Sequence, residues 1–361
     1  MNLNEIISGI KSVNSEARNV ARVRNDVLIK PIGSLGKIEE LSVKLAGITG
    51  DAFSSYQKKA IIIMCSDNGV YEEGVSVAPQ MITLMQSTNF QKNITGVGVL
   101  SQLSNSDMVV VDIGINSSVQ SEHFLNRKIR KGTSNVAKEP AMTKEEAFKA
   151  IEIGFEEVEK LHKKGYNVIG TGEMGIGNTT TASLIIMALT GCSVDRAAGK
   201  GAGLTEEQFK MKKQVIRNAY ELHKPDAEDP IDVLSKLGGF DIAGLVGVFL
   251  GAAYHRLPVV IDGVISSSAA LLAYKLCEAS REYMIPSHFS EEPGYVIAMK
   301  TLGMEPYFNL NMRLGEGTGC PFTFLLIDAA ESIIKKMATF DEVSMDNSTL
   351  VDIREDKASS A

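Results

Sequence analysis

Residues 166–183 read YNVIGTGEMGIGNTTTAS, and this stretch decides the fold class. The segment Tyr166–Ile169 is short, apolar and typical of a buried parallel strand. The glycine-rich residues from Gly170 onward predict a turn. A helix is expected to start near Asn178 or Thr179, since both residue types are good N-caps. A strand followed by a turn and a helix is the repeating unit of α/β proteins.

Three other segments have the same character, because each is apolar, rich in β-branched residues and followed by a polar or glycine-rich turn. They are Ala60–Cys65, Met108–Ile113 and Pro258–Ile261. Helical patterns lie between them, and the clearest opens on the capping box Thr143–Glu146. The alternation predicts a doubly wound, Rossmann-like parallel sheet. Ligands bind beyond the carboxyl ends of such strands, so we expect the site at four turns. These turns are SDNG (66–69), DIGIN (112–116), GTGEMG (170–175) and DGVISS (262–267).

Helical patterns also occupy both ends of the chain. The first 50 residues look helical apart from the turn KPIGSLGK, and so do residues 321–339. We expect these pieces to pack together as a smaller helical domain, built from residues 1–50 and 311–345. The second piece also carries an active-site loop. Residues 51–310 would then form the large α/β domain, and residues 346–361 a polar, frayed tail.

The composition excludes several classes of protein. The chain has 361 residues, a net charge of −7, 44% hydrophobic and 22% charged residues, which is typical of a soluble globular protein. The chain has no dense block of Lys and Arg residues, which disfavours nucleic-acid binding. No apolar run in it is long enough to span a membrane. The four cysteines are expected to be buried, reduced thiols, which favours a cytoplasmic protein. The five histidines lack metal-ligand spacing, so we expect neither a metal nor a cofactor.

The motif GTGEMG is a literal GxGxxG, and Asp195 lies about 20 residues after it. A dinucleotide site is therefore one interpretation. It would, however, bring the Glu173 carboxylate against the pyrophosphate. The longer run to Thr180 fits a cradle for a single phosphate at a helix N-terminus, formed by Gly175 to Thr180 with Glu173 at its rim. A capped turn without a ligand is the third interpretation.

A second glycine-framed carboxylate is Glu316, in RLGEGTG (313–319). Flexible glycines leave such a side chain accessible to a ligand, although a solvated loop glutamate is the simpler alternative. Glu173 and Glu316 would divide acid/base work if the fold brings them together. Lys212 or Lys213 could reach a phosphate from a helix. The alternative is that both lysines lie on a solvated helix face. The chain contains neither a Walker A motif nor GxSxG, which disfavours a P-loop NTPase and an α/β-hydrolase.

Taken together, these motifs resemble the nicotinate-nucleotide–dimethylbenzimidazole phosphoribosyltransferase family. The segments that carry the resemblance keep the family's order from residue 30 to 319, and GEMGIGNTT with LGEGTG is highly specific. They are KPIGSLGKIEEL (30–41), DNGVYEEGVSVAPQMIT (67–83), GTGEMGIGNTTTAS (170–183), GKGAGL (199–204), GGFDIAGLVG (238–247), VVIDGVISSSAALLA (259–273), HFSEEPG (288–294) and RLGEGTG (313–319).

The resemblance implies a reaction in which ribose 5-phosphate moves from nicotinate mononucleotide to an aromatic base, with inversion at C1′. It makes Glu316 the general base and places Glu173 near the ribose, where it stabilises cationic charge at C1′ or holds the hydroxyls. It also implies a homodimer with a small helical domain. The expected substrate-binding residues are Gly175, Ile176, Gly177, Asn178, Thr179, Thr180, Gly201, Lys212, Ser76, Gln80, Gln86, Asp262, Arg313, Leu314 and Gly315.

The chain departs from the family's usual DHGV at Asn68, in a loop expected to border the base pocket. This leaves the acceptor open between dimethylbenzimidazole, another benzimidazole, adenine and a phenol. Two other hypotheses remain. An NAD-dependent oxidoreductase would rest on GxGxxG alone, and a non-catalytic nucleotide-binding regulator would keep the fold without turnover.

Overall fold

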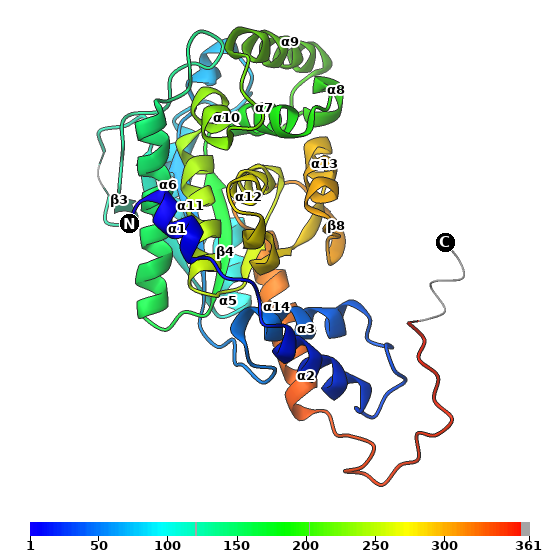
Figure 1. Ribbon diagram of the computed structural model, residues 1–361. Helices are drawn as coiled ribbons and strands as arrows, with labels where there is room; N and C mark the ends of the chain where they lie inside the picture. Colours follow the sequence, from blue (N-terminus) through cyan, green and yellow to red (C-terminus); the bar gives the residue numbers. More distant parts are fainter. Residues whose placement is uncertain (120, 202, 355–361) are drawn as a thin grey trace.

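The computed structural model describes residues 1–119, 121–201 and 203–354 (Figure 1). A six-stranded parallel sheet with strand order β3-β2-β1-β4-β5-β6 lies at its centre. Its strands are β1 (Lys59–Ser66), β2 (Ser106–Gly114), β3 (Leu125–Asn126), β4 (Val168–Met174), β5 (Val259–Ile261) and β6 (Met284–Pro286). This order is that of doubly wound dinucleotide-binding folds, so the predicted fold class is confirmed. A second sheet pairs β7 (His288–Ser290) with β8 (Phe308–Met312) in parallel.

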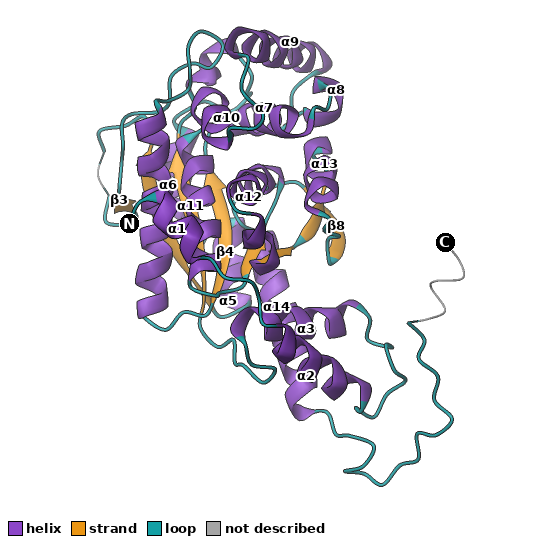
Figure 2. Cartoon of the chain, viewed as in Figure 1, coloured by secondary structure: helices purple, strands orange, loops and turns teal. Residues whose placement is uncertain are grey.

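Helices lie on both faces of the central sheet (Figure 2). The helices of the described residues are α1 (Leu3–Gly9), α2 (Ser15–Asp26), α3 (Lys37–Thr49), α4 (Ile82–Phe90), α5 (Gly96–Leu103), α6 (Lys144–Lys163), α7 (Asn178–Thr190), α8 (Val194–Ala197), α9 (Glu206–His223), α10 (Pro230–Leu237), α11 (Phe240–Tyr254), α12 (Val264–Leu276), α13 (Pro293–Leu302) and α14 (Gly319–Lys336), with 3₁₀ helices at Gly69–Glu73 and Glu278–Tyr283. The predicted capping box is present, because Thr143 caps α6 and Glu146 bonds back to the Thr143 N–H.

Side chains of β1 point alternately to the two faces of the sheet, so this strand contributes to a core on each face. Ile62 and Met64 pack into the core under α6, α11 and α12, whereas Ile61 and Ile63 pack into the core under α5 and α14. Every residue of β1 is buried, as expected for a central parallel strand covered on both faces. Strand β1 pairs in parallel with β4, and β4 with β5, so the carboxyl ends of the three strands lie at one edge of the sheet.

Strand β4 corrects the sequence interpretation of the glycine-rich stretch. The predicted strand 166–169 and turn 170–175 are replaced by a strand that runs from Val168 to Met174, which places Glu173 in the strand. The glycines of this strand make room for another loop, since a Cβ on Gly172 would lie 2.6 Å from the Glu316 carbonyl oxygen. Helix α7 begins at Asn178, as predicted, but Gly177 occupies the N-cap position.

Helices α6 and α11 pack with their backbones in contact. A Cβ on Gly154 of α6 would lie 1.9 Å from the Gly244 carbonyl oxygen, and one on Gly247 of α11 would lie 1.9 Å from the Ile151 carbonyl oxygen. Such distances leave no room for a methyl group without separating the helices. These two glycines therefore serve helix packing and have no direct link to a ligand.

Gly154→Ala is accordingly expected to lower the free energy of unfolding by about 1–3 kcal/mol, as overpacking typically does. Urea unfolding followed by circular dichroism measures the change. The control is Lys149→Ala on the exposed face of the same helix, expected to stay within about 0.5 kcal/mol of the parent chain. Equal stabilities of the two variants would contradict the packing argument.

A smaller helical unit formed by α2, α3 and α14 lies below the sheet in Figure 1. Helix α1 does not join it, because Ile6 and Ile10 are buried in the core shared with α6 and α11. Residues 341–354 also contact this unit, where Arg354 pairs with Asp26 at 3.0 Å. The rest of the expected frayed tail, residues 355–361, lies outside the described residues. The domain boundaries at 50, 310 and 345 stay predictions.

Candidate active site

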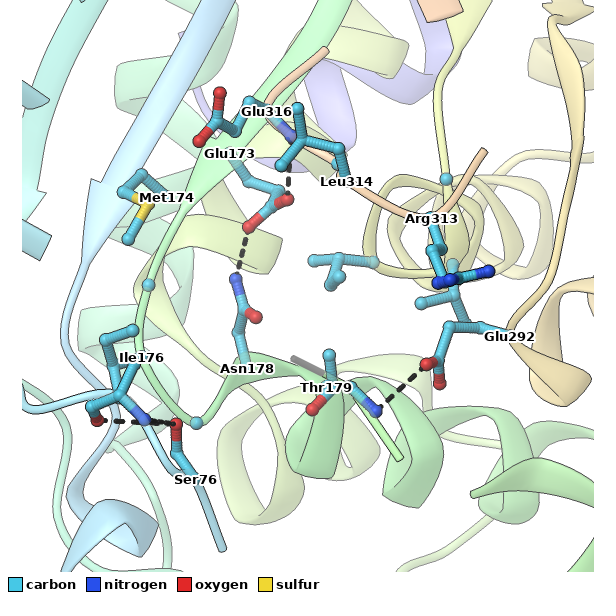
Figure 3. A pocket seen from close by; sticks show the side chains of 18 of the residues that line it. Ser76, Glu173, Met174, Ile176, Asn178, Thr179, Glu292, Arg313, Leu314 and Glu316 are labelled. Carbon is cyan, nitrogen blue, oxygen red and sulfur yellow. Dashed lines mark hydrogen bonds between the residues drawn. The ribbon is translucent and has the colours of Figure 1, made fainter. Parts of the chain in front are cut away.

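A cavity of about 440 Å³ opens at the carboxyl ends of β4 and β5, next to the point where strand order reverses between β1 and β4. Most predicted site residues line it. They are Ser76, Glu173, Gly175, Ile176, Gly177, Asn178, Thr179, Gly201, Asp262, Arg313, Leu314, Gly315 and Glu316. In Figure 3, Glu173, Asn178 and Glu316 lie on one side of the cavity, with Arg313 and Glu292 across from them.

The remaining predicted residues lie outside this lining, each with a different role. Gln86 and Lys212 contact lining residues from behind, and Thr180 is fully buried. Gln80 accepts a hydrogen bond from Asn116 at 3.0 Å. The turn 112–116, which we expected at the site, is also absent from the described lining, because Asp112 faces away and pairs with Lys128 at 3.0 Å.

Glu316 has the geometry of a general base. Its Oε1 accepts a hydrogen bond from the Gln86 side chain at 2.7 Å, whereas its buried Oε2 has no partner among the described residues. Burial raises the pKa of this carboxyl above its usual value, although the Gln86 contact lowers it. The free oxygen can therefore accept a proton from a group in the cavity.

Glu173 reaches the same loop from the end of β4. Its Oε1 accepts a hydrogen bond from the Glu316 backbone N–H at 3.3 Å, and its Oε2 accepts one from the Asn178 side chain (Figure 3). Burial and the nearby Asp241 carboxylate raise the pKa of Glu173 to about 8. The fold thus brings together the two glycine-framed glutamates that the sequence singled out.

Asp241 is a functional neighbour that the sequence analysis did not select. Its Oδ2 accepts a hydrogen bond from the same Asn178 amide at 2.9 Å, so Asn178 links Asp241 to Glu173. Burial raises the pKa of Asp241 to about 6. One sequence feature could have identified it, because Asp241 is a lone acidic residue in the otherwise apolar helix α11.

Asn68 belongs to this buried cluster and lies outside the cavity lining. It is fully buried, and its Oδ1 accepts a hydrogen bond from Thr181 at 3.5 Å. A Cβ on Gly177 would lie 3.4 Å from the Asn68 Cβ, so the residue lies behind the glycine turn. Asn68 itself is thus absent from the described lining, and the expectation that its loop borders the base pocket stays a prediction.

The turn before α7 forms the other end of the cavity. Gly177 has φ +96°, a conformation that favours glycine, and the turn presents the N-terminus of α7 to the cavity. Behind it, the Lys212 ammonium donates to Thr179 Oγ1 at 2.8 Å and to the Gly199 carbonyl oxygen at 3.0 Å. Burial lowers the pKa of Lys212 to about 8. This end can bind an anion.

Known proteins share this fold and these motifs. A family model described as phosphoribosyltransferase matches residues 10–345. The nicotinate-nucleotide–dimethylbenzimidazole phosphoribosyltransferase of Clostridium tetani is 51% identical over 354 residues, which cover 98% of this chain and 98% of that protein. The chain belongs to that phosphoribosyltransferase family. The protein of the same name from Clostridium perfringens (strain ATCC 13124) is 50% identical, again over 98% of each chain.

The solved structures agree with this family assignment. The crystal structure of CobT from Thermus thermophilus is similar with a TM-score of 0.88 and 34% identity, and the match covers 92% of this chain and 99% of that one. The chain is thus a phosphoribosyltransferase, which is a pentosyltransferase. Within the described residues, no helix is both long and apolar enough to cross a membrane.

Proposed function

We propose that this phosphoribosyltransferase transfers ribose 5-phosphate from nicotinate mononucleotide to 5,6-dimethylbenzimidazole or a related base in cobamide biosynthesis. The products are nicotinate and an α-ribazole 5′-phosphate-type nucleotide. The observation that carries the proposal is the buried, unpartnered Oε2 of Glu316 in a cavity whose other end suits a phosphate. The names of the relatives, at about half identity over nearly the whole chain, support the same substrates.

The proposed chemistry is a single displacement at C1′. One ring nitrogen of the acceptor attacks C1′ while the bond from C1′ to the pyridinium nitrogen breaks, and its electrons neutralise the departing nicotinate ring. The acceptor's N–H proton moves to Oε2 of Glu316. The Glu173 carboxylate, held by Asn178, stabilises positive charge that develops at C1′ or holds the ribose hydroxyls.

The binding roles follow from the two ends of the cavity. The backbone of Gly175–Thr179 and the N-terminus of α7 would bind the 5′-phosphate, with Lys212 supporting them through Thr179. The acceptor would lie against Ser76, Met174 and Leu314, beside Glu316. An adenine, another benzimidazole or a phenol remains an alternative acceptor, because apolar walls accept any flat aromatic ring of this size.

Incubation with nicotinate mononucleotide and a panel of acceptors tests the proposal. Chromatography with mass detection follows nicotinate release and the mass of each product. Product formation with a benzimidazole supports the proposal, whereas product with a phenol alone would reassign the acceptor. Binding of NAD without any binding of nicotinate mononucleotide, measured by calorimetry, would instead favour the oxidoreductase interpretation.

We further propose a cytoplasmic homodimer. All four cysteines are free in the structure, which suits a reducing compartment. Two consecutive helices near the cavity expose apolar side chains at helical spacing, namely Met81 and Met85 at α4 and Val99 and Leu103 on α5. Exposed apolar residues grouped in this way mark interfaces, so a second copy would cover them.

Sedimentation velocity is expected to give about twice the chain mass of 39.0 kDa. Leu103→Glu, whose parent side chain is 64% exposed, should shift the protein toward the monomer. The control is Leu222→Glu, which alters an exposed leucine on α9, outside the apolar residues of α4 and α5. This variant should remain dimeric. A monomeric parent chain would contradict the proposal.

A further inference from the structure

The loop that carries Glu316 has an unusual backbone. Gly315, Glu316 and Gly317 have φ values of +81°, +63° and +92°, so three consecutive residues lie in the left-handed region. Glycine adopts this region freely, but a glutamate pays a steric cost there. Such a conformation persists only when the surrounding structure holds it.

Asp262 holds the loop from the end of β5. Its Oδ2 accepts a hydrogen bond from the Gly317 N–H at 3.0 Å, and its Oδ1 accepts one from the Gly319 N–H at 2.7 Å. These two N–H groups belong to the residues on either side of Thr318, just after Glu316 in the chain. Gly319 is also the first residue of α14, where a carboxylate interacts favourably with the positive end of the helix.

Asp262 is itself fixed by the residues around it. It is only 1% exposed, its backbone N–H donates to Ser266 Oγ at 3.2 Å, and its carbonyl oxygen accepts from Ser287 Oγ at 3.1 Å. The His288 Nδ1 lies 4.0 Å from Oδ1. The loop packs tightly against this group, since a Cβ on Gly319 would lie 2.4 Å from His288 Nδ1. Asp262 therefore cannot follow the loop if the loop relaxes.

We infer that Asp262 is the positioning residue of the general base, because its carboxylate holds the loop that keeps Glu316 in the left-handed conformation at the wall of the cavity. The inference rests on the proposed transfer with Glu316 as its base. Asp262 also lines the cavity, so its expected contact with substrate stays a prediction beside this positioning role. Glu173 holds the same loop at one further point, the Glu316 N–H.

Asp262→Asn tests the inference with little change in side-chain volume. The new amide nitrogen is a donor, so it faces one of the two loop N–H groups and breaks that contact. We expect kcat to fall by about 10- to 100-fold, because small misplacements of a catalytic group have effects of that size. The KM for nicotinate mononucleotide is expected to stay within about twofold, since the phosphate turn lies on β4 and α7.

A double-mutant cycle separates positioning from a general loss of folded protein. In the Glu316→Gln background, Asp262→Asn should cause no further loss of the residual rate, because the base it positions is gone. The rates are divided by the concentration of competent sites, titrated by calorimetry with nicotinate mononucleotide. Tyr295→Phe is the control, as it removes only a hydroxyl from a buried side chain stacked on His288, and it should keep the parent kcat.

Two results would overturn the inference. One is the same fractional loss from Asp262→Asn in both backgrounds, which indicates a purely structural role. The other is an unchanged kcat in Asp262→Asn. Absence of transfer in the parent chain would instead overturn the proposed function, so the two failures are distinguishable.

Discussion

Glu316→Gln is expected to lower kcat by at least about a hundredfold, since a positioned general base typically contributes 10²- to 10⁴-fold. The substitution preserves the length of the side chain and the oxygen that accepts from Gln86, but it replaces the free oxygen with a donor. The proton of the acceptor then has no base. Nicotinate mononucleotide should still bind, because the phosphate turn is unchanged.

Acceptor acidity gives this prediction an internal control. A phenol acidic enough to be ionised at the assay pH needs no base, so it should lose less rate from Glu316→Gln than a benzimidazole does. Glu305→Gln, which alters an exposed glutamate paired with Lys37, should keep the parent rate with every acceptor. Turnover near the parent value in Glu316→Gln would remove the base assignment.

The sequence predicted the parts of this site that follow from local pattern. The apolar strands, the start of α7 and the carboxylate framed by glycines can each be recognised in a few neighbouring residues, because periodicity and backbone freedom act locally. The place of Glu173 at the carboxyl end of a central strand follows from the α/β topology. Its contact with Glu316 was left conditional on the fold, and the loop between β8 and α14 makes it.

What the sequence did not predict depends on contacts between distant segments. The glycines of GTGEMG indicate a turn, yet Gly170 and Gly172 lie in β4, where the Glu316 loop packs against Gly172. Asp241 bonds to Asn178 from 63 residues away, and no local pattern connects the two. Helix α1 has one apolar face, but that face alone does not specify whether it packs on α2 or on α11.

Glu173 is expected to make the reaction depend on pH near 8. Its pKa of about 8 has two causes that the site shows, namely burial at the strand end and the Asp241 carboxylate that shares Asn178. Asp262, at the end of β5, adds a smaller repulsion that also raises the pKa of Glu173. No cation is among the groups that shift this pKa. At pH 7 roughly a tenth of the empty sites would therefore hold an ionised Glu173.

The sign of the effect follows from the proposed role. An ionised Glu173 stabilises positive charge at C1′, so kcat/KM, which reports the free enzyme, should rise as the pH increases from 7. The rise should end where Lys212, whose pKa is also about 8, loses the charge that supports phosphate binding. The pyridinium ring of bound nicotinate mononucleotide carries a positive charge, which favours ionisation of Glu173. The rise in kcat should therefore occur at a lower pH than the rise in kcat/KM.

Glu173→Gln should abolish the pH-dependent rise and lower kcat by about a hundredfold, as removal of a group that stabilises transition-state charge commonly does. It should also change stability. The buried acid keeps a proton that the unfolded chain loses above pH 4.5, so the parent's free energy of unfolding declines as the pH rises from about 4.5 to 8. In Glu173→Gln this decline should be smaller, as measured by urea unfolding across that range.

The control is Glu228→Gln, which alters an exposed glutamate before α10 and should reproduce the parent in both measurements. If Glu173→Gln keeps the rise near pH 8, the rise belongs to another group and the charge-stabilising role fails. If the rise disappears while kcat stays near the plateau of the parent, Glu173 affects only which protonation state binds substrate. If the pH-dependent rise and the rate are both lost, Glu173 acts in the chemical step, beside the base Glu316, whose backbone N–H donates to the Glu173 carboxylate.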